Sequence, residues 1–219
     1  MSEGLSGTPR PPWRDKLEIT RQKIKYAQQG AELKDAQDKA AKDELTGLMS
    51  RRAFMERADS ILKDLYAARD PQKSQRDRKI SSVCFIGVDI DHFRIVNKKL
   101  GHPGADVVLK QIAETLTKGL RASDDLVARI GGEEITILFL GSRELALTKA
   151  KELCAAIEAL PFDVDGKPVT ASFGVTEVGA DEEPSLDEML KRADKALYAA
   201  KDAGRNRVVE YSLALEAGS

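Results

Sequence analysis

Short apolar runs along the chain predict the strands of a sheet. The first, VCFIGVDID at 83–91, stays apolar until it ends in carboxylates, which is typical of a buried strand that reaches the edge of a sheet. The other strands are expected at 126–130, 135–140, 162–178 (as a hairpin) and 208–211. Gly131-Gly132 and Asp165-Gly166 are residue pairs that favour tight turns, so each predicts the connection of a hairpin.

Apolar residues spaced three and four apart predict helices between these strands. The helices are expected at 51–68, 92–100, from 103 onward, at 143–160 and from 185 to 204. Gly101 stops the second helix, and Pro103 suits the first turn of the next. Ser185 with Glu188 forms a capping box. The order of elements predicts an α/β (α+β) fold, a βαββαβ sheet with an added hairpin and helical backing.

The N-terminal residues differ in composition from the rest. Residues 1–12 are rich in Gly, Ser and Pro and are expected to form a disordered tail. In residues 13–42 Lys, Glu, Gln and Ala dominate, which predicts an N-terminal helix. Its apolar seven-residue spacing is weak, so two interpretations stay open: a dimerising coil, or a solvated helix packing one face on its own domain. Residues 43–212 are expected to form one domain and 213–219 a C-terminal tail.

Charge and cysteine usage narrow the class of protein. Lys and Arg number 35 and Asp and Glu 36, a net charge of −1, which excludes a polybasic nucleic-acid coat and an acidic solvating tail. No stretch approaches the roughly 18 consecutive apolar residues of a membrane span, and no secretory signal is visible at the N-terminus. Cys84 and Cys154 both lie within apolar patterns, which favours a reduced, cytoplasmic protein.

Carboxylates at the end of the first strand are the sharpest chemical feature. Asp89 and Asp91 are two residues apart, so their side chains point to the same face of a strand. Adjacent strands are about 4.8 Å apart, so Asp89 and Glu133 could share a divalent ion that bridges to substrate phosphates. The alternative is that the Asp89–Asp91 pair and the Gly-Gly-Glu-Glu segment at 131–134 merely mark strand ends and turns.

Further candidates each have a structural and a functional interpretation. Gly131 and Gly132 could serve the turn alone or let a nucleotide approach the backbone. Lys201 and Arg205 are four apart on the last expected helix and could hold a polyphosphate, or simply complement the helix end. His92 and His102 lack metal-ligand spacing with any cysteine, and neither a P-loop nor a dinucleotide-binding glycine motif occurs.

Together these segments resemble the GGDEF domain of bacterial diguanylate cyclases, whose fold is similar to nucleotidyl cyclases. The resemblance covers roughly residues 43–211. It is carried by DELTGLMSRR (43–52), DIDHFRIVNKKLGHPGADVVL (89–109), ARIGGEEITILF (128–139), ASFGVTE (171–177) and ADKALYAAKDAGRNRV (193–208).

The resemblance implies an enzyme that condenses two GTP into cyclic di-GMP and two pyrophosphates. It implies that Asp89, Glu133 and the backbone carbonyl of Ile90 bind two Mg²⁺ or Mn²⁺ ions in each active site. Glu134 would lie near the metals and the 3′-hydroxyl, and a general-base role for it stays open. The remaining implied substrate-binding residues are Phe93, Asn97 and Asp106 (the last two for guanine), Gly131, Gly132, and Lys201 with Arg205 for the triphosphate.

Because each such domain holds one GTP, the resemblance implies a homodimer as the active species. It also implies cyclic di-GMP as product and inhibitor, and an upstream regulatory protein acting through residues 13–42. The alternative is a GGDEF-like domain with weak or no turnover that binds GTP or cyclic di-GMP and signals through a partner. A third option is a different purine nucleotidyl cyclase.

Departures from the family pattern bear on turnover and on inhibition. Ile135 stands where Phe or Leu is usual, Arg94 replaces Lys, and Lys98 replaces an acid. The inhibitory RxxD motif corresponds to Arg121 and Asp124, but six residues, rather than five, separate it from the signature. A working inhibitory site and a surface salt link at a helix end are both compatible with this spacing.

Overall fold

The computed structural model describes residues 40–69, 82–179 and 182–212, together with positions 25 and 215. The tails expected at 1–12 and nearly all of 213–219 lie outside the described residues, as does most of the expected helix at 13–42. Residues 41–219 form one compact unit, and the architecture below is that of this unit. No helix among the described residues combines the length and apolarity needed to cross a membrane.

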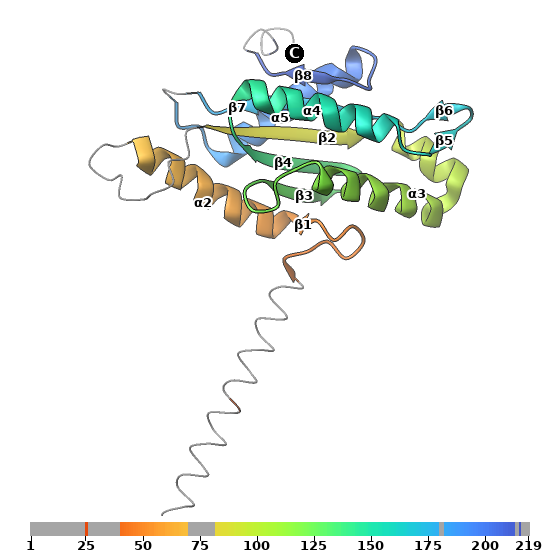
Figure 1. Ribbon diagram of the computed structural model, residues 1–219, viewed down its shortest axis with the longest axis horizontal. Coiled ribbons are helices and arrows are strands. Elements are labelled where there is room, and N and C mark those ends of the chain that lie inside the picture. The colour runs from red at the N-terminus through yellow and green to blue at the C-terminus, as the bar shows by residue number, and fades with distance from the viewer. Residues whose placement is uncertain (1–24, 26–39, 70–81, 180–181, 213–214, 216–219) are drawn as a thin grey trace, which may run out of the picture. The chain divides into compact units, whose positions relative to one another are not determined.

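A mixed sheet of six strands forms the centre of the unit (Figure 1). In spatial order the strands are β1 (Met49–Ser50), β3 (Leu126–Gly131), β4 (Glu134–Leu140), β2 (Val83–Ile90), β7 (Ala171–Glu177) and β8 (Val208–Glu210). The four inner strands pair antiparallel, whereas β1 runs parallel to β3 and β8 parallel to β7. The predicted α/β class with an antiparallel-containing sheet is confirmed.

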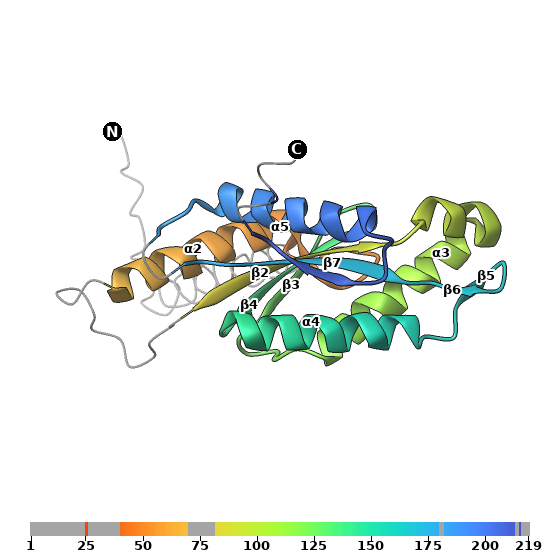
Figure 2. The ribbon, with the colours of Figure 1, turned by 90° about the horizontal axis from the view of Figure 1, so that it is seen from above.

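Helices cover both faces of this sheet (Figure 2). They are α2 (Arg51–Arg69), α3 (Phe93–Lys118), α4 (Arg143–Glu158) and α5 (Leu186–Asp202). Alternate residues of β2 enter two separate cores: Cys84 and Ile86 pack with α3 and α4, and Phe85 packs with α2 and α5. Every residue of β2 is therefore buried, as its apolar run predicts.

A glycine of β7 lets α5 approach the sheet closely. A Cβ atom built on Gly174 would lie 2.2 Å from the backbone nitrogen of Leu197 and 2.3 Å from the carbonyl oxygen of Ala193. On the neighbouring strand, a Cβ atom on Gly87 would lie 3.5 Å from a methyl carbon of Leu197, an ordinary contact. The close approach at Gly174 sets the distance of α5 from the sheet, and with it the position of Lys201 two turns further on.

The hairpin predicted over 162–178 is wrong in extent. Only β5 (Asp163–Val164) and β6 (Lys167–Pro168) form it, as a separate two-stranded sheet. The predicted turn is confirmed, since Asp165 and Gly166 both have positive φ, 56° and 77°. The following apolar run is instead β7, which pairs with β2 and β8. Its first six residues are all buried, which agrees with its largely apolar sequence.

The predicted break at Gly101 is also confirmed. Gly101 has φ 68° and ψ 170°, and it divides α3 into two arms that run in different directions (Figure 2). A positive φ of this size favours glycine over residues that carry a Cβ atom.

Candidate active site

The last part of β2 delivers a carboxylate to the edge of the sheet. Asp89 pairs in register with Glu134 of β4 on one side and with Ser172 of β7 on the other. Its side chain lies on the α5 face, where Lys201 Nζ is 2.9 Å from its Oδ2 atom. The residue is buried, with 7% of its surface exposed. An ionisable group this buried needs a charge partner, and Lys201 provides it.

The turn between β3 and β4 brings two more carboxylates close to Asp89. A bulge between Arg129 and Gly131 and a positive φ of 50° at Gly132 shape this turn. Burial raises the pKa of Asp89 against the lowering influence of Lys201, and the nearby charges of Glu133 and Asp91 raise it further. Burial also raises the pKa of Glu134, with Asp89 as the next influence. The negative charges of these carboxylates therefore act on one another, and a divalent ion shared by Asp89 and Glu133 stays a prediction.

Arg205 does not lie on the last helix, so that part of the prediction is wrong. Helix α5 ends at Asp202, and Arg205 follows in the left-handed region with φ 63°. Its guanidinium Nη1 donates to the carbonyl oxygen of Lys201 at 3.3 Å. Arg205 nevertheless stays beside the last turn of α5, because its backbone nitrogen donates to the carbonyl oxygen of Ala200 at 3.0 Å.

Asp91, the other aspartate at the end of the strand, is held by hydrogen bonds from neighbouring segments. Its carboxylate accepts hydrogen bonds from Thr170 Oγ1 and Ser172 Oγ at 2.7 Å each and from the backbone nitrogen of Asn206 at 3.0 Å. These bonds join the ends of β2 and β7 to the segment that follows Arg205. Asp91 thus fixes the backbone around the site.

A bridge of side chains connects the start of the domain to the β3–β4 turn. Arg129 Nε donates to the carbonyl oxygen of Gly132 at 2.7 Å, and its Nη1 atom contacts both carboxylate oxygens of Asp43 at 3.2 and 3.3 Å. Asp43 also accepts from the backbone nitrogen and hydroxyl of Thr46. Burial raises the pKa of Asp43, but the bonds from Thr46 and Arg129 outweigh it and leave the pKa lowered. Sequence reasoning missed this bridge.

The residues expected to contact guanine lie on the two arms of α3. Asn97 precedes the kink at Gly101 and Asp106 follows it, and both are partly exposed. Asn97 Nδ2 makes a long contact of 3.4 Å to the carbonyl oxygen of Phe93. The Phe93 side chain packs into the core under α3 and α4. Its expected contact with substrate would therefore involve little of the ring.

The expected inhibitory motif is engaged in a local ion pair. Arg121 donates from Nη2 and Nε to the carboxylate of Asp125 at 2.8 and 3.2 Å, and its guanidinium lies 4.9 Å from the centre of the Phe139 ring. Arg121 also donates to the carbonyl oxygen of Leu140. The carboxylate that Arg121 contacts is thus the one from Asp125, one position after Asp124.

The donor set of the site fits a hard divalent cation. Asp89 and Glu133 offer carboxylate oxygens, the ligands that Mg²⁺ prefers, and Mg²⁺ typically uses one or two carboxylates plus substrate phosphates and water. Among the described residues no three His, Cys, Asp or Glu side chains converge to hold a metal on their own. The Ile90 carbonyl stays a predicted ligand.

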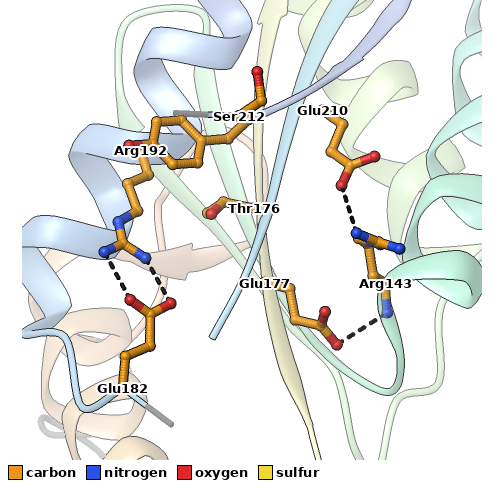
Figure 3. Close-up of a pocket in the computed structure, with 8 residues that line it drawn as sticks. Arg143, Thr176, Glu177, Glu182, Arg192, Glu210 and Ser212 are labelled. Atoms are coloured by element: carbon orange, nitrogen blue, oxygen red, sulfur yellow. Dashed lines mark hydrogen bonds and ion pairs between the residues drawn. The ribbon is translucent and has the colours of Figure 1, made fainter. Parts of the chain in front are cut away.

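A separate cavity of about 390 Å³ lies at the opposite end of the sheet (Figure 3). One wall carries Arg192, paired with Glu182 at 2.8 and 2.9 Å. The other carries Arg143, whose guanidinium pairs with Glu210 and whose backbone nitrogen donates to Glu177, each at 3.2 Å. Thr176 lies between the walls (Figure 3). Both arginines are paired with carboxylates of the same cavity, so among the described residues its lining presents no unpaired cation to an anionic ligand.

Known proteins are similar to the same part of the chain. The family model of the diguanylate cyclase GGDEF domain matches residues 40–207. The chain is 38% identical over 179 residues to the diguanylate cyclase DgcP of Pseudomonas aeruginosa, which covers 80% of this chain and 25% of that protein. It is 35% identical over 175 residues to the response regulator PleD of Caulobacter vibrioides, covering 78% and 36%. The chain therefore spans a quarter to about a third of the length of these relatives.

Solved structures show the same likeness. The coiled coil and GGDEF domain of DgcB from Caulobacter crescentus, in complex with c-di-GMP, superposes with a TM-score of 0.74 at 25% identity, covering 89% of this chain and 98% of that one. The diguanylate cyclase SiaD, in complex with its activator SiaC from Pseudomonas aeruginosa, gives a TM-score of 0.64 at 32% identity, covering 90% and 72%.

Proposed function

The chain belongs to the diguanylate cyclase GGDEF-domain family, and on that premise we propose that it condenses two GTP molecules into cyclic di-GMP and two pyrophosphates. The observation that carries the proposal is the meeting of Asp89 with the Glu133-Glu134 turn beside Lys201. This is the combination of acids and a cation that handling a metal-bound triphosphate requires.

In the proposed reaction each side chain has a separate task. Asp89, Glu133 and the Ile90 carbonyl would hold two Mg²⁺ or Mn²⁺ ions, which, when bound, neutralise phosphate charge and favour ionisation of the ribose hydroxyl. Lys201 and Arg205 orient the triphosphate, and Gly131 and Gly132 give it room near the backbone. The 3′-oxygen of each GTP attacks the α-phosphorus of the other, so two phosphodiester bonds form, two bonds to pyrophosphate break, and each hydroxyl releases its proton. Glu134 lies near the hydroxyl that loses its proton.

Guanine specificity is proposed to depend on α3. Guanine presents N1–H and N2–H₂ donors beside the O6 acceptor, which complements the carboxylate of Asp106 and the amide of Asn97. We expect GTP to be preferred over ATP by about 10⁴-fold in kcat/KM, since adenine leaves the Asp106 acceptor unpaired. Asp106→Ala should lower kcat/KM for GTP by about 10²-fold and leave that for ATP unchanged. Equal loss with both nucleotides would contradict a base-reading role.

Arg129 is proposed to position the β3–β4 turn through its bond to Gly132. Arg129→Met removes this bond and the pair with Asp43, and we expect kcat to fall about 10-fold, equivalent to about 1.4 kcal/mol. Asp43→Asn is the matched control, because it weakens the other end of the bridge and leaves the donor to Gly132 in place. It should lower thermal stability with kcat changed less than about 2-fold. An equal loss of kcat in both variants would show that Arg129 acts only through stability.

A product made from two GTP requires two domains facing each other, so we propose a homodimer as the active species. We further propose that residues 13–42 receive input from an upstream protein. Two relatives support this: one was solved with its coiled coil, and the other in complex with an activator. Inhibition by product at Arg121 and Asp124 stays a proposal, with Asp125 as the carboxylate that Arg121 contacts.

The second candidate function is nucleotide binding without turnover, and Ile135, Arg94 and Lys98 motivate it. Ile135 is fully buried in β4, while Arg94 and Lys98 are exposed on α3, so none removes a proposed ligand. Calorimetric titration with GTP and Ca²⁺, followed by incubation with GTP and Mg²⁺ and chromatography, separates the two functions. We expect binding and formation of cyclic di-GMP, with less product from Glu134→Ala. Binding without product would favour the second function.

A further inference from the structure

The ammonium group of Lys201 has two partners, one observed and one proposed. Its Nζ atom is 2.9 Å from Asp89 Oδ2, and the two side chains are 31% and 11% exposed. Lys201 is also the last-turn cation of α5 that the proposed function assigns to the triphosphate. The ammonium has three donors, but a dication bound at Asp89 would repel it, so the carboxylate contact and the phosphate contact belong to different states of the site.

We propose that Lys201 is an internal competitor for the divalent cation at Asp89, and that the arriving triphosphate draws it away. The inference rests on the proposed function, because it takes Asp89 as a metal ligand and Lys201 as a phosphate ligand. Its consequence is that the chain alone binds a divalent cation weakly. Metal and nucleotide then bind cooperatively, each favouring the other by the same factor.

The contacts around Asp89 explain the competition. An ammonium at hydrogen-bond distance occupies one carboxylate oxygen and repels a dication at the same carboxylate. The remaining acids of the site, Glu133 and Glu134, lie on a turn that is partly exposed to solvent, so their attraction for a cation is screened more than that of Asp89. Breaking the Lys201–Asp89 pair without a replacement would leave a buried carboxylate unpaired, which is costly.

The exchange of partners avoids that cost when nucleotide is present. Lys201 gains a phosphate as it leaves Asp89, and Asp89 gains the dication, so both charges are paired before and after. The flexible four-carbon stem of lysine permits such a movement without a shift of α5. The ion pair therefore keeps the acids of the site compatible with folding until metal and nucleotide arrive together.

Arg205 supplies a matched comparison within the same site. It carries the same charge and lies four residues on, but its guanidinium donates to the Lys201 carbonyl oxygen. Among the described residues, no ion pair joins Arg205 to a carboxylate. Removing Arg205 alters the general field at the site, whereas removing Lys201 alters both the field and the direct competition.

The test measures Mn²⁺ affinity of the full chain without nucleotide, from the electron paramagnetic resonance signal of free Mn²⁺. Lys201→Met should tighten Mn²⁺ binding about 10-fold and Arg205→Met less than about 3-fold. With a non-hydrolysable GTP analogue present, Lys201→Met should weaken nucleotide binding about 10-fold, the opposite sign. Circular dichroism confirms that both variants are folded, and Lys201→Arg, which keeps a cation, should bind Mn²⁺ as weakly as the parent.

Two outcomes overturn the inference: Lys201→Met binding Mn²⁺ no more tightly than the parent, or Arg205→Met tightening it equally. A parent chain that forms cyclic di-GMP while either outcome holds would contradict this inference alone. A parent chain that binds neither Mn²⁺ nor GTP would contradict the proposed function as well.

Discussion

Asp89→Asn is expected to lower the rate of cyclic di-GMP formation by at least about 10³-fold, equivalent to about 4 kcal/mol of transition-state stabilisation. The change keeps the size of the side chain and removes the buried negative charge that pairs with Lys201. Without it the site loses a proposed metal ligand. The measurement is initial rate at saturating GTP and Mg²⁺, with product quantified by chromatography.

Asp194→Asn is the matched control for this prediction. Asp194 is an exposed carboxylate of α5 whose charge reaches Glu134, but it has no proposed contact with metal or substrate. Its replacement should change the rate less than about 2-fold, because interactions between exposed charges are screened. If Asp89→Asn retained more than a tenth of the parent rate, Asp89 would not be the metal carrier.

Gly174→Ala is expected to destabilise the fold by about 3 kcal/mol or more. The new methyl carbon would fall 2.2 Å from the Leu197 nitrogen and 2.3 Å from the Ala193 oxygen. Both atoms belong to the α5 backbone, so the helix itself must move away from the sheet, and overpacking of this kind is costly. Urea unfolding followed by circular dichroism measures the loss as a lower midpoint at unchanged slope.

Gly87→Ala tests whether the cost comes from this particular contact. Gly87 faces the same helix from the adjacent strand, but its Cβ atom would meet Leu197 and Ala193 at 3.5 and 3.6 Å. We expect a change in unfolding free energy below about 1 kcal/mol. A Gly174→Ala variant as stable as Gly87→Ala would mean that α5 is not held at the distance described.

Much of the architecture could be predicted because local patterns determine it. The β2 run is buried on both faces, so its apolar sequence is unbroken, and the β3–β4 turn requires a positive φ that Gly132 supplies. The same reasoning predicted the Gly131-Gly132 hairpin that carries Glu133, whereas a metal ion shared by Asp89 and Glu133 stays a prediction. The hairpin at 162–178 was overextended, because an apolar run does not reveal whether it pairs with the preceding strand or with a distant one.

The features that sequence reasoning missed depend on contacts between distant residues. Arg129 and Asp43 are 86 positions apart, and no periodicity connects them. Arg205 was placed on a helix by its spacing from Lys201, although Gly204 already predicted that the helix ends before it. Arg121 pairs with Asp125 because the chain turns there, with the Asp125 nitrogen donating to the Arg121 carbonyl oxygen at 2.9 Å.

Acids at the end of β2 and in the β3–β4 turn are proposed to support the joining of two GTP molecules. The most direct measurement quantifies pyrophosphate and cyclic di-GMP formed from GTP and Mg²⁺ over a wide range of protein concentrations. We expect two pyrophosphates for each cyclic di-GMP, with specific activity rising with protein concentration until the dimer is formed. One pyrophosphate for each cyclic mononucleotide, or no pyrophosphate at any concentration, would contradict this expectation.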